Sequence, residues 1–226
     1  MTKPRIAILT LAIGADYKRD LAPCLESKRK YAARHGYTYF EGGEEFWDRH
    51  RPIAWSKIPF WLHILRTYKD QFDYLWISDA DVFITNPDLK LEDHVLPLMP
   101  SNADLMWNFD ACHHLNSGNM IFRPSQWLEE FLDRVWNHTE DLYHIWYENF
   151  AMIRCSENDT SGKIFVNKRH EIFNAYIGGH KNEHLWQPGD FLVHFAGVYD
   201  GRKIKDLVQQ ISNGIVPRIN WFPNEE

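Results

Sequence analysis

The chain contains the segment Asp73-Tyr74-Leu75-Trp76-Ile77-Ser78-Asp79-Ala80-Asp81, in which a short apolar run is followed at once by two carboxylates. Because the run comes after a polar break, it predicts a central strand that is buried on both faces. Ligands of open α/β sheets gather at the carboxyl ends of strands, which is where Asp79 and Asp81 stand. Two carboxylates one residue apart can converge on one hard cation, Mg²⁺ or Mn²⁺. The triplet also fits two aspartates that only form a turn or cap a helix, so the segment alone does not decide whether a cation binds here.

Segments of strand character alternate with segments of helical character along the rest of the chain. Short, largely apolar runs predict strands over residues 5–11, 37–40, 73–78, 105–107, 119–122, 164–166 and 191–195. Segments of helical character predict helices over residues 20–35, 56–68, 124–136, 149–155 and 203–211. We expect Gly36 to end the first helix and Ser56 to cap the second. This alternation predicts one α/β domain with a largely parallel sheet.

The composition is that of an ordinary globular domain. The chain has 226 residues, 44% hydrophobic and 25% charged, with a net charge of −6. No apolar run approaches the ~20 residues that span a bilayer, and the N-terminus has no signal-peptide core, so we expect neither a membrane span nor secretion. The acidic balance argues against nucleic acid as a partner. Cys24, Cys112 and Cys155 are odd in number and far apart, which predicts neither disulfides nor a zinc knuckle and fits a reducing compartment.

A histidine in the late apolar segment 191–195 is a candidate for a role in chemistry. His194 is either a core histidine or, if the fold brings it to Asp79 and Asp81, a metal ligand. The sequence separation of 113 residues does not decide between these interpretations.

Two polar segments in the second half of the chain are further candidates. Asn116, Ser117 and Gly118 can place an amide and a hydroxyl on a sugar, or can simply form a turn. Glu148 and Asn149 can act beside a reacting centre, or can start a helix with an acid in its first turn.

In their order, these segments resemble one family: the retaining glycosyltransferases that include fungal α-1,2-galactosyltransferases, yeast α-1,6-mannosyltransferase subunits and plant xyloglucan xylosyltransferases (glycosyltransferase family 34). The resemblance covers nearly the whole chain, and the closing segment Gly-Asp-Phe-Leu-Val-His-Phe-Ala-Gly is its most specific part. The matching segments are residues 8–10, 28–37, 51–57, 76–81, 115–118, 148–149, 173–176 and 189–197.

The resemblance implies a GT-A type fold. This would be a single domain over residues 1–226, with a Rossmann-like, mostly parallel central sheet flanked by helices and the DxD triplet at a strand end. Residues from about 1 to 100 would bind the nucleotide, and residues from about 101 to 226 would bind the acceptor and the donor sugar.

The resemblance also assigns roles to individual residues. Asp79, Asp81 and His194 match the family's metal ligands, with Mn²⁺ or Mg²⁺ as the cofactor. Glu148 and Asn149 match an acid–amide pair beside the anomeric carbon and are the expected catalytic residues. In the family the amide is usually Gln, and Asn149 is one methylene shorter.

Two further groups of residues are expected to contact the donor. The nucleotide is expected beside Thr10, Lys57, Ser78 and Asp79, and the sugar beside Asn116, Ser117, Gly118 and Gly197. Val198 and Tyr199 stand where relatives often carry Cys and, in plants, a diphosphate-binding Lys, so that lysine is not carried over. Arg202 or Lys203 is the alternative for its role.

The implied function is a metal-dependent retaining glycosyltransferase. It would move a hexose or pentose from a nucleotide sugar to a glycan hydroxyl and form an α-linkage, with UDP-sugars favoured over GDP-mannose. The expected partners are the nucleotide sugar and a glycan acceptor. Two alternatives stay open: a metal-dependent nucleotidyltransferase or phosphohydrolase, and a non-catalytic carbohydrate-binding protein. Eukaryotic relatives are anchored in the Golgi, whereas this chain shows no anchor. We therefore expect a cytoplasmic bacterial or viral enzyme, with the Golgi lumen as the location only of an excised domain.

Overall fold

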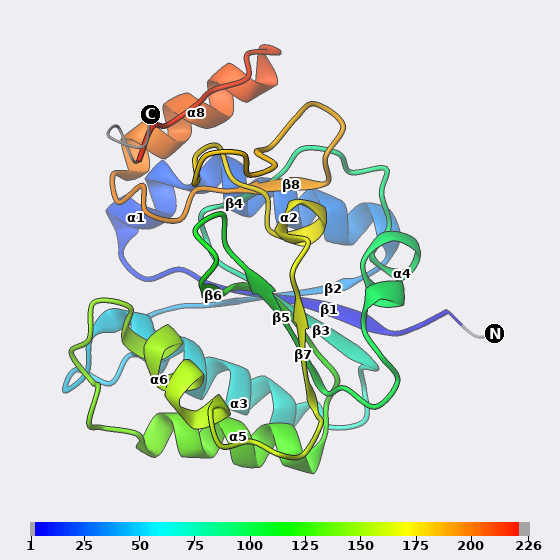
Figure 1. The fold of residues 1–226 in the computed structure, drawn as a ribbon, viewed down its shortest axis with the longest axis vertical. Coiled ribbons are helices and arrows are strands. Elements are labelled where there is room, and N and C mark those ends of the chain that lie inside the picture. Colours follow the sequence, from blue (N-terminus) through cyan, green and yellow to red (C-terminus); the bar gives the residue numbers. More distant parts are fainter. Residues whose placement is uncertain (1–2, 222–226) are drawn as a thin grey trace.

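A six-stranded sheet separates two layers of helices in the structure, a computed structural model that describes residues 3–221 (Figure 1). Its strands, in the spatial order β2-β1-β3-β6-β5-β7, are β1 (Ile6–Leu11), β2 (Thr38–Gly42), β3 (Tyr74–Ser78), β5 (Leu105–Phe109), β6 (Leu115–Phe122) and β7 (Ile164–Asn167). β1 pairs in parallel with β2 and β3, and β5 pairs in parallel with β7. Only β6 runs antiparallel to its two neighbours among the described strands of this sheet. The predicted α/β architecture with a mostly parallel sheet is confirmed.

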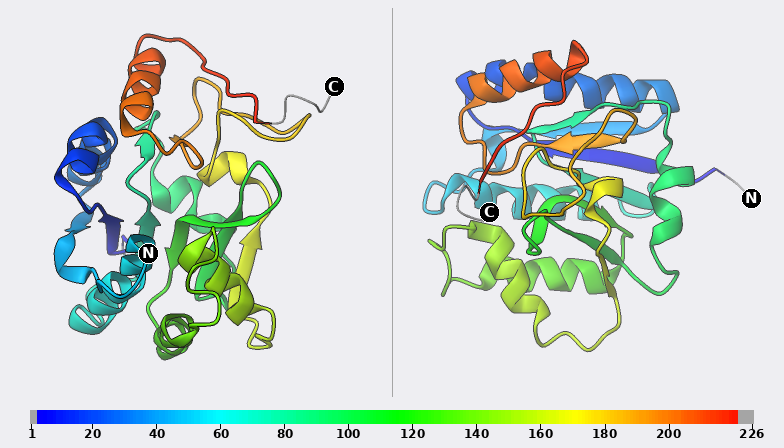
Figure 2. Two further views of the ribbon diagram at one scale, coloured as in Figure 1. Left: turned by 90° about the vertical axis from the view of Figure 1, so that its left-hand side faces the viewer. Right: turned by 45° about the horizontal axis from the view of Figure 1, so that its top comes forward.

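The two faces of the sheet are covered by different elements. One face packs on α3 (Lys57–Thr67), α5 (Gln126–Asn137) and α6 (Tyr147–Ser156). The other face is covered by α2 (Ala22–His35) and by a second sheet, in which β4 (Val82–Ile84) pairs antiparallel with β8 (Leu192–His194). The helix α1 (Ala15–Asp20) lies beside α2 in this layer, and α8 (Gly201–Ser212) packs against both from the outside, as two further views show (Figure 2). The short helices are α4 (Leu91–His94) and α7 (His170–Phe173). Within residues 3–221, no helix has the length and apolar content needed to cross a membrane.

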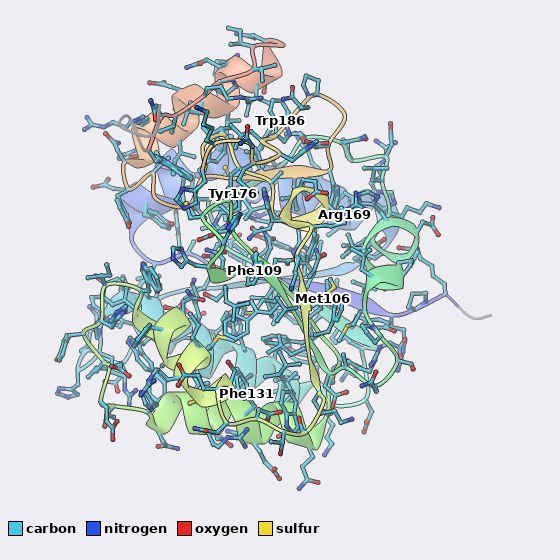
Figure 3. The ribbon with its side chains drawn as sticks, in the orientation of Figure 1. Met106, Phe109, Phe131, Arg169, Tyr176 and Trp186 are labelled. Carbon is cyan, nitrogen blue, oxygen red and sulfur yellow. The ribbon has the colours of Figure 1, made fainter. Side chains whose placement is uncertain are left out.

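Alternating side chains of β1 show how the sheet divides the core. Ala7 and Leu9 belong to the apolar cluster that packs on α3, α5 and α6, whereas Ile6 and Ile8 belong to a cluster with α2 and β4. This is the period of two that a strand buried on both faces requires. Figure 3 shows side chains filling both layers, with Phe131 on one side of the sheet and Tyr176 and Trp186 on the other.

The element boundaries follow local signals closely, with a few differences. Gly36 ends α2 in the left-handed conformation, at φ 70°, as predicted. Ser56 directly precedes α3 but makes no capping hydrogen bond, because it closes a 3₁₀ turn over Ile53–Ser56 and already has helical dihedral angles. β6 starts at Leu115 rather than at residue 119, since the polar residues before 119 continue the ladder with β5. β4 has three residues, too few to show a period in the sequence.

Candidate active site

The turn that carries the two aspartates lies at the carboxyl end of the central strand β3. Asp79 follows the last residue of β3, and Asp81 precedes the first residue of β4. The backbone N–H of Asp79 donates to the carbonyl of Gly118 on the neighbouring strand β6 at 2.7 Å. The turn is thus fixed to the main sheet on one side and leads into the small sheet on the other.

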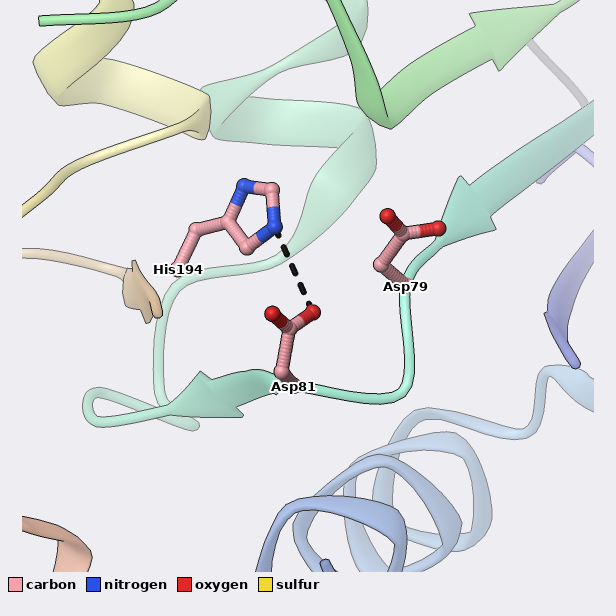
Figure 4. A group of neighbouring side chains, drawn as sticks. All are labelled: Asp79, Asp81 and His194. Atoms are coloured by element: carbon pink, nitrogen blue, oxygen red, sulfur yellow. Dashed lines mark ion pairs between the residues drawn. The ribbon is translucent and has the colours of Figure 1, made fainter. Parts of the chain in front are cut away.

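The small sheet brings His194 to this turn. His194 is the last residue of β8 and stands opposite Val82 in the β4–β8 ladder, next to Asp81. Its Nε2 lies 3.3 Å from Oδ1 of Asp81, and one ligand atom from each of Asp79, Asp81 and His194 lies within 4.8 Å of the others (Figure 4). The fold therefore provides the juxtaposition on which the interpretation of His194 depends.

The other face of the imidazole is held by a buried amide network. His194 is 1% exposed, and its Nδ1 lies 2.9 Å from Oδ1 of Asn174. That oxygen also accepts from Nδ2 of Asn119 at 3.1 Å, while Nδ2 of Asn174 donates to the hydroxyl of Tyr176 at 2.6 Å. This pattern identifies Oδ1 as the acceptor, so Nδ1 of His194 donates to Asn174 and Nε2 is the ring atom that faces Asp81 and would bind a cation. Metal-binding histidines are usually oriented in this way.

These three side chains fit a divalent cation such as Mn²⁺ or Mg²⁺. Two carboxylate oxygens and one neutral imidazole nitrogen can coordinate one ion, with water or substrate oxygens completing the shell. Burial would raise the pKa of Asp81, but His194 and the ammonium groups of Lys28 and Lys57 hold that pKa below its usual value. Asp81 is therefore in the charged form that a metal requires.

Lys57 connects the aspartate turn with the predicted catalytic acid. Its Nζ lies 2.8 Å from Oδ1 of Asp79 and 2.9 Å from Oε1 of Glu148. Burial alone would lower the pKa of Lys57, but the two carboxylates raise it above its ordinary value. Glu148 is 2% exposed and also accepts from Oγ of Ser117 at 3.2 Å. Burial raises its pKa, and Lys57 partly offsets this effect.

Asn149, the second predicted catalytic residue, is oriented by the main chain. Its Nδ2 donates to the carbonyl of Leu115 at 2.9 Å. Its Oδ1 is buried and finds no hydrogen-bond partner among residues 3–221. The preceding helix start is strained, because Tyr147, a non-glycine residue, has φ 46°. The hydroxyls of Thr10 and Ser78 are buried without a partner among the described residues in the same way, and the role of Asn149 at the anomeric carbon stays a prediction.

The residues expected at the donor sugar lie on β6 beside the metal ligands. Gly118 leaves room for His194, since a Cβ at this position would stand 2.2 Å from Cε1 of the imidazole. Oδ1 of Asn116 accepts from the N–H of Gly118 at 2.9 Å, and Ser117 holds Glu148. Their contacts with a sugar stay a prediction.

Of three other predicted positions, Thr10 and Ser78 are buried, whereas Gly197 is exposed. Thr10 is 0% exposed and Ser78 is 2% exposed, so neither hydroxyl reaches the surface in this structure. Gly197 follows β8 with φ 82° and has nothing closer to its Cβ position than Trp221, at 3.9 Å. The roles of these residues in donor binding also stay predictions.

Three residues that support the site, Lys28, Asn174 and Tyr176, have no individually predicted role. Lys28, on α2, is fully buried and donates to main-chain carbonyls of the aspartate turn. Burial lowers the pKa of Lys28 to about 8. A signal was available, because Lys28 stands three residues from both Leu25 and Tyr31, on the buried face of the helix.

Comparison with known proteins shows similarity to one family of glycosyltransferases. Residues 2–106 match the model of the galactosyl transferase GMA12/MNN10 family. The chain is 26% identical to an uncharacterized α-1,2-galactosyltransferase of Schizosaccharomyces pombe, over 87% of this chain and 68% of that protein. It is 22% identical to the probable α-1,6-mannosyltransferase MNN10 of Saccharomyces cerevisiae, over 79% of this chain but only 55% of that protein. These yeast relatives give no support to the expected bacterial or viral source.

A solved structure has the same fold. The glycosyltransferase involved in the glycosylation of the major capsid of PBCV-1 superposes with a TM-score of 0.71, over 92% of this chain and all of that chain, at 15% identity. The GT-A-like architecture is thus shared with a protein of very different sequence.

Proposed function

We propose that this chain, whose residues 2–106 match the galactosyl transferase GMA12/MNN10 family, is a metal-dependent retaining glycosyltransferase that moves a hexose or pentose from a nucleotide sugar to a glycan hydroxyl. The observation that carries the proposal is that Asp79, Asp81 and His194 lie together at the end of β3. Lys57 links this cluster to Glu148, because it forms ion pairs with both Asp79 and Glu148. We favour a UDP-sugar as the donor, with GDP-mannose second. The nucleotide would bind to residues from about 1 to 100.

A cation fits the first step of this reaction. When bound by Asp79, Asp81 and His194, Mn²⁺ or Mg²⁺ would stabilise the negative charge that develops on the leaving nucleoside diphosphate. The chain has to hold these ligands in place, and the hydrogen bond from His194 to Asn174 does so for the imidazole.

The second requirement is stabilisation of positive charge on the anomeric carbon. Glu148 supplies a carboxylate whose position is fixed by Lys57 and Ser117, and Asn149 supplies an oriented amide oxygen. Fixed groups of this kind interact more strongly with the transition state than with the bound donor. We favour attack from the same face as the departing diphosphate, which then accepts the proton of the acceptor hydroxyl. This route retains the anomeric configuration.

The alternatives have weaker support. A nucleotidyltransferase or phosphohydrolase would need further carboxylates around the cation, but Asp88 binds Arg34 and Glu92 binds Tyr37. In residues 3–221, the acidic and imidazole groups that could hold a metal ion form a single cluster. A non-catalytic sugar-binding protein would not need that cluster.

The test is a donor screen with the full chain. UDP-sugars and GDP-mannose are incubated with and without Mn²⁺, release of the nucleoside diphosphate is measured, and the anomer of the product is read by NMR. A thermal-shift series with the same nucleotides identifies the base. We expect Mn²⁺-dependent turnover with an α-product, lost in Asp81→Asn and kept in Asp93→Asn, an exposed carboxylate control on α4. Turnover that survives EDTA, or a β-product from an α-linked donor, would refute the proposal.

A further inference from the structure

A fully buried lysine lies under the turn that carries the aspartates. Lys28 projects from α2 and is 0% exposed. Its Nζ lies 2.6 Å from the carbonyl oxygen of Asp79, 3.3 Å from that of Ala80 and 2.9 Å from that of Val82. The three donors of one ammonium group are thus matched by three carbonyl acceptors.

The one remaining carbonyl of the turn is held from the other side. The oxygen of Asp81 accepts from the backbone N–H of Phe195 at 3.2 Å. Phe195 directly follows His194, so this bond links the turn to the strand that carries the imidazole. All four carbonyls of residues 79–82 therefore have donors, and the path of the turn is set by α2 and β8 together.

Burial of the Lys28 ammonium group costs free energy, which argues that its hydrogen bonds to the turn have a role. Burying an ammonium group is unfavourable unless hydrogen bonds replace its hydration. An apolar side chain at this position would avoid that cost but would remove the ammonium donor from these carbonyls, and that of Asp79 would keep the backbone N–H of Val82, at 3.2 Å. With the carbonyls drawn toward Lys28, the carboxylates of Asp79 and Asp81 are free to lie on the same side as His194 (Figure 4).

We propose that Lys28 is a positioning residue that holds the main chain of residues 79–82 so that the carboxylates of Asp79 and Asp81 are preorganised for a divalent cation. This inference rests on the cation site of the proposed function. Residues that orient metal ligands without touching the metal typically change metal affinity 10- to 100-fold when they are replaced.

The experiment measures Mn²⁺ binding to the full chain without nucleotide, by isothermal calorimetry and by the Mn²⁺ electron paramagnetic resonance signal, beside the melting temperature of the metal-free protein. In Lys28→Met, which is close to lysine in length and lacks the ammonium group, we expect Mn²⁺ affinity to fall about tenfold or more. Tyr31→Phe is the matched control. It removes another hydrogen bond from α2 to a main-chain carbonyl, the 2.7 Å bond to Leu89, and should leave Mn²⁺ affinity unchanged.

The outcomes separate this inference from the proposed function. If the wild type binds no Mn²⁺, the metal-dependent function fails. If the wild type binds Mn²⁺ and Lys28→Met binds it equally well, only the inference about Lys28 is overturned. If Lys28→Met then also has a lower melting temperature, the role of Lys28 is purely structural. If Lys28→Met does not fold, Lys28→Gln, which keeps an N–H donor, is measured instead. We expect weakened Mn²⁺ binding in that variant, and wild-type affinity would overturn the proposal.

Discussion

Replacing Gly118 with alanine should damage the metal site and destabilise the fold at the same time. The new Cβ would lie 2.2 Å from Cε1 and 2.8 Å from Nε2 of His194. An ordinary carbon–carbon contact is about 3.5–4.0 Å, so the imidazole has to retreat by more than about 1 Å. The ring has little freedom to do so, because it is buried and its Nδ1 is bound to Asn174.

The sign of the stability change follows from two opposing effects. Gly118 has no left-handed φ, so alanine suits the backbone and would by itself stabilise the protein by about 0.4–1 kcal/mol. Overpacking a tight interior costs about 1–3 kcal/mol. We therefore expect a net loss of about 1–2 kcal/mol in the free energy of unfolding. A displacement of about 1 Å in a ligand should also weaken Mn²⁺ binding by about 10- to 100-fold.

Urea unfolding of the metal-free protein and calorimetric titration with Mn²⁺ measure the two effects. A double-mutant cycle assigns the cause, because Gly118→Ala should lose most of its destabilising effect when His194→Ala has already removed the ring. The reasoning is refuted if Gly118→Ala is as stable as the wild type with unchanged Mn²⁺ affinity. It is also refuted if the loss of stability is the same in the His194→Ala background.

Other changes test the remaining roles. Asp81→Ala should abolish Mn²⁺-dependent nucleotide binding while the fold survives, because the turn lies at the edge of the core; unchanged calorimetric binding would contradict the metal assignment. Glu148→Gln should lower kcat about 10²-fold or more with little change in donor KM, and wild-type turnover with the same anomer would argue against its role. Asn149→Ala should likewise lower kcat, whereas a rise in acceptor KM alone would reassign it to acceptor placement. Burial raises the pKa of Cys24 to about 12, so at pH 8 its thiolate is scarce and iodoacetamide should leave it unmodified until the protein unfolds; mass spectrometry of the folded protein checks this.

Local patterns were sufficient for most of the fold, because burial and periodicity act over a few residues. The apolar run 74–78 is indeed the central strand, and the two aspartates stand at its carboxyl end. The position of His194 was not accessible in this way. It depends on the pairing of β4 with β8, and a strand of three residues carries too little pattern to predict a partner.

The direction in which individual side chains point was also difficult to predict from the sequence. Thr10 shares the even-numbered face of β1 with Ile6 and Ile8, and its hydroxyl is buried; because both faces of this strand are covered, its place near a strand end does not show whether the hydroxyl lines a site. The role of Thr10 beside the nucleotide stays a prediction. Lys28 lies in the helix predicted over residues 20–35 and has no predicted role of its own, although its spacing from Leu25 and Tyr31 places it on the buried face.

The pairing of β4 with β8 also sets the order in which the site is completed during synthesis. Asp81 leaves the ribosome 113 residues before His194. At about 5–20 residues per second, this delay lasts roughly 5 to 25 s. Throughout that interval the nascent chain has the two neighbouring carboxylates but not the imidazole of His194, and β4 lacks its partner strand. Loss of β8 by truncation would leave the chain in the same state, with the two aspartates as the cation ligands and without His194 as the third.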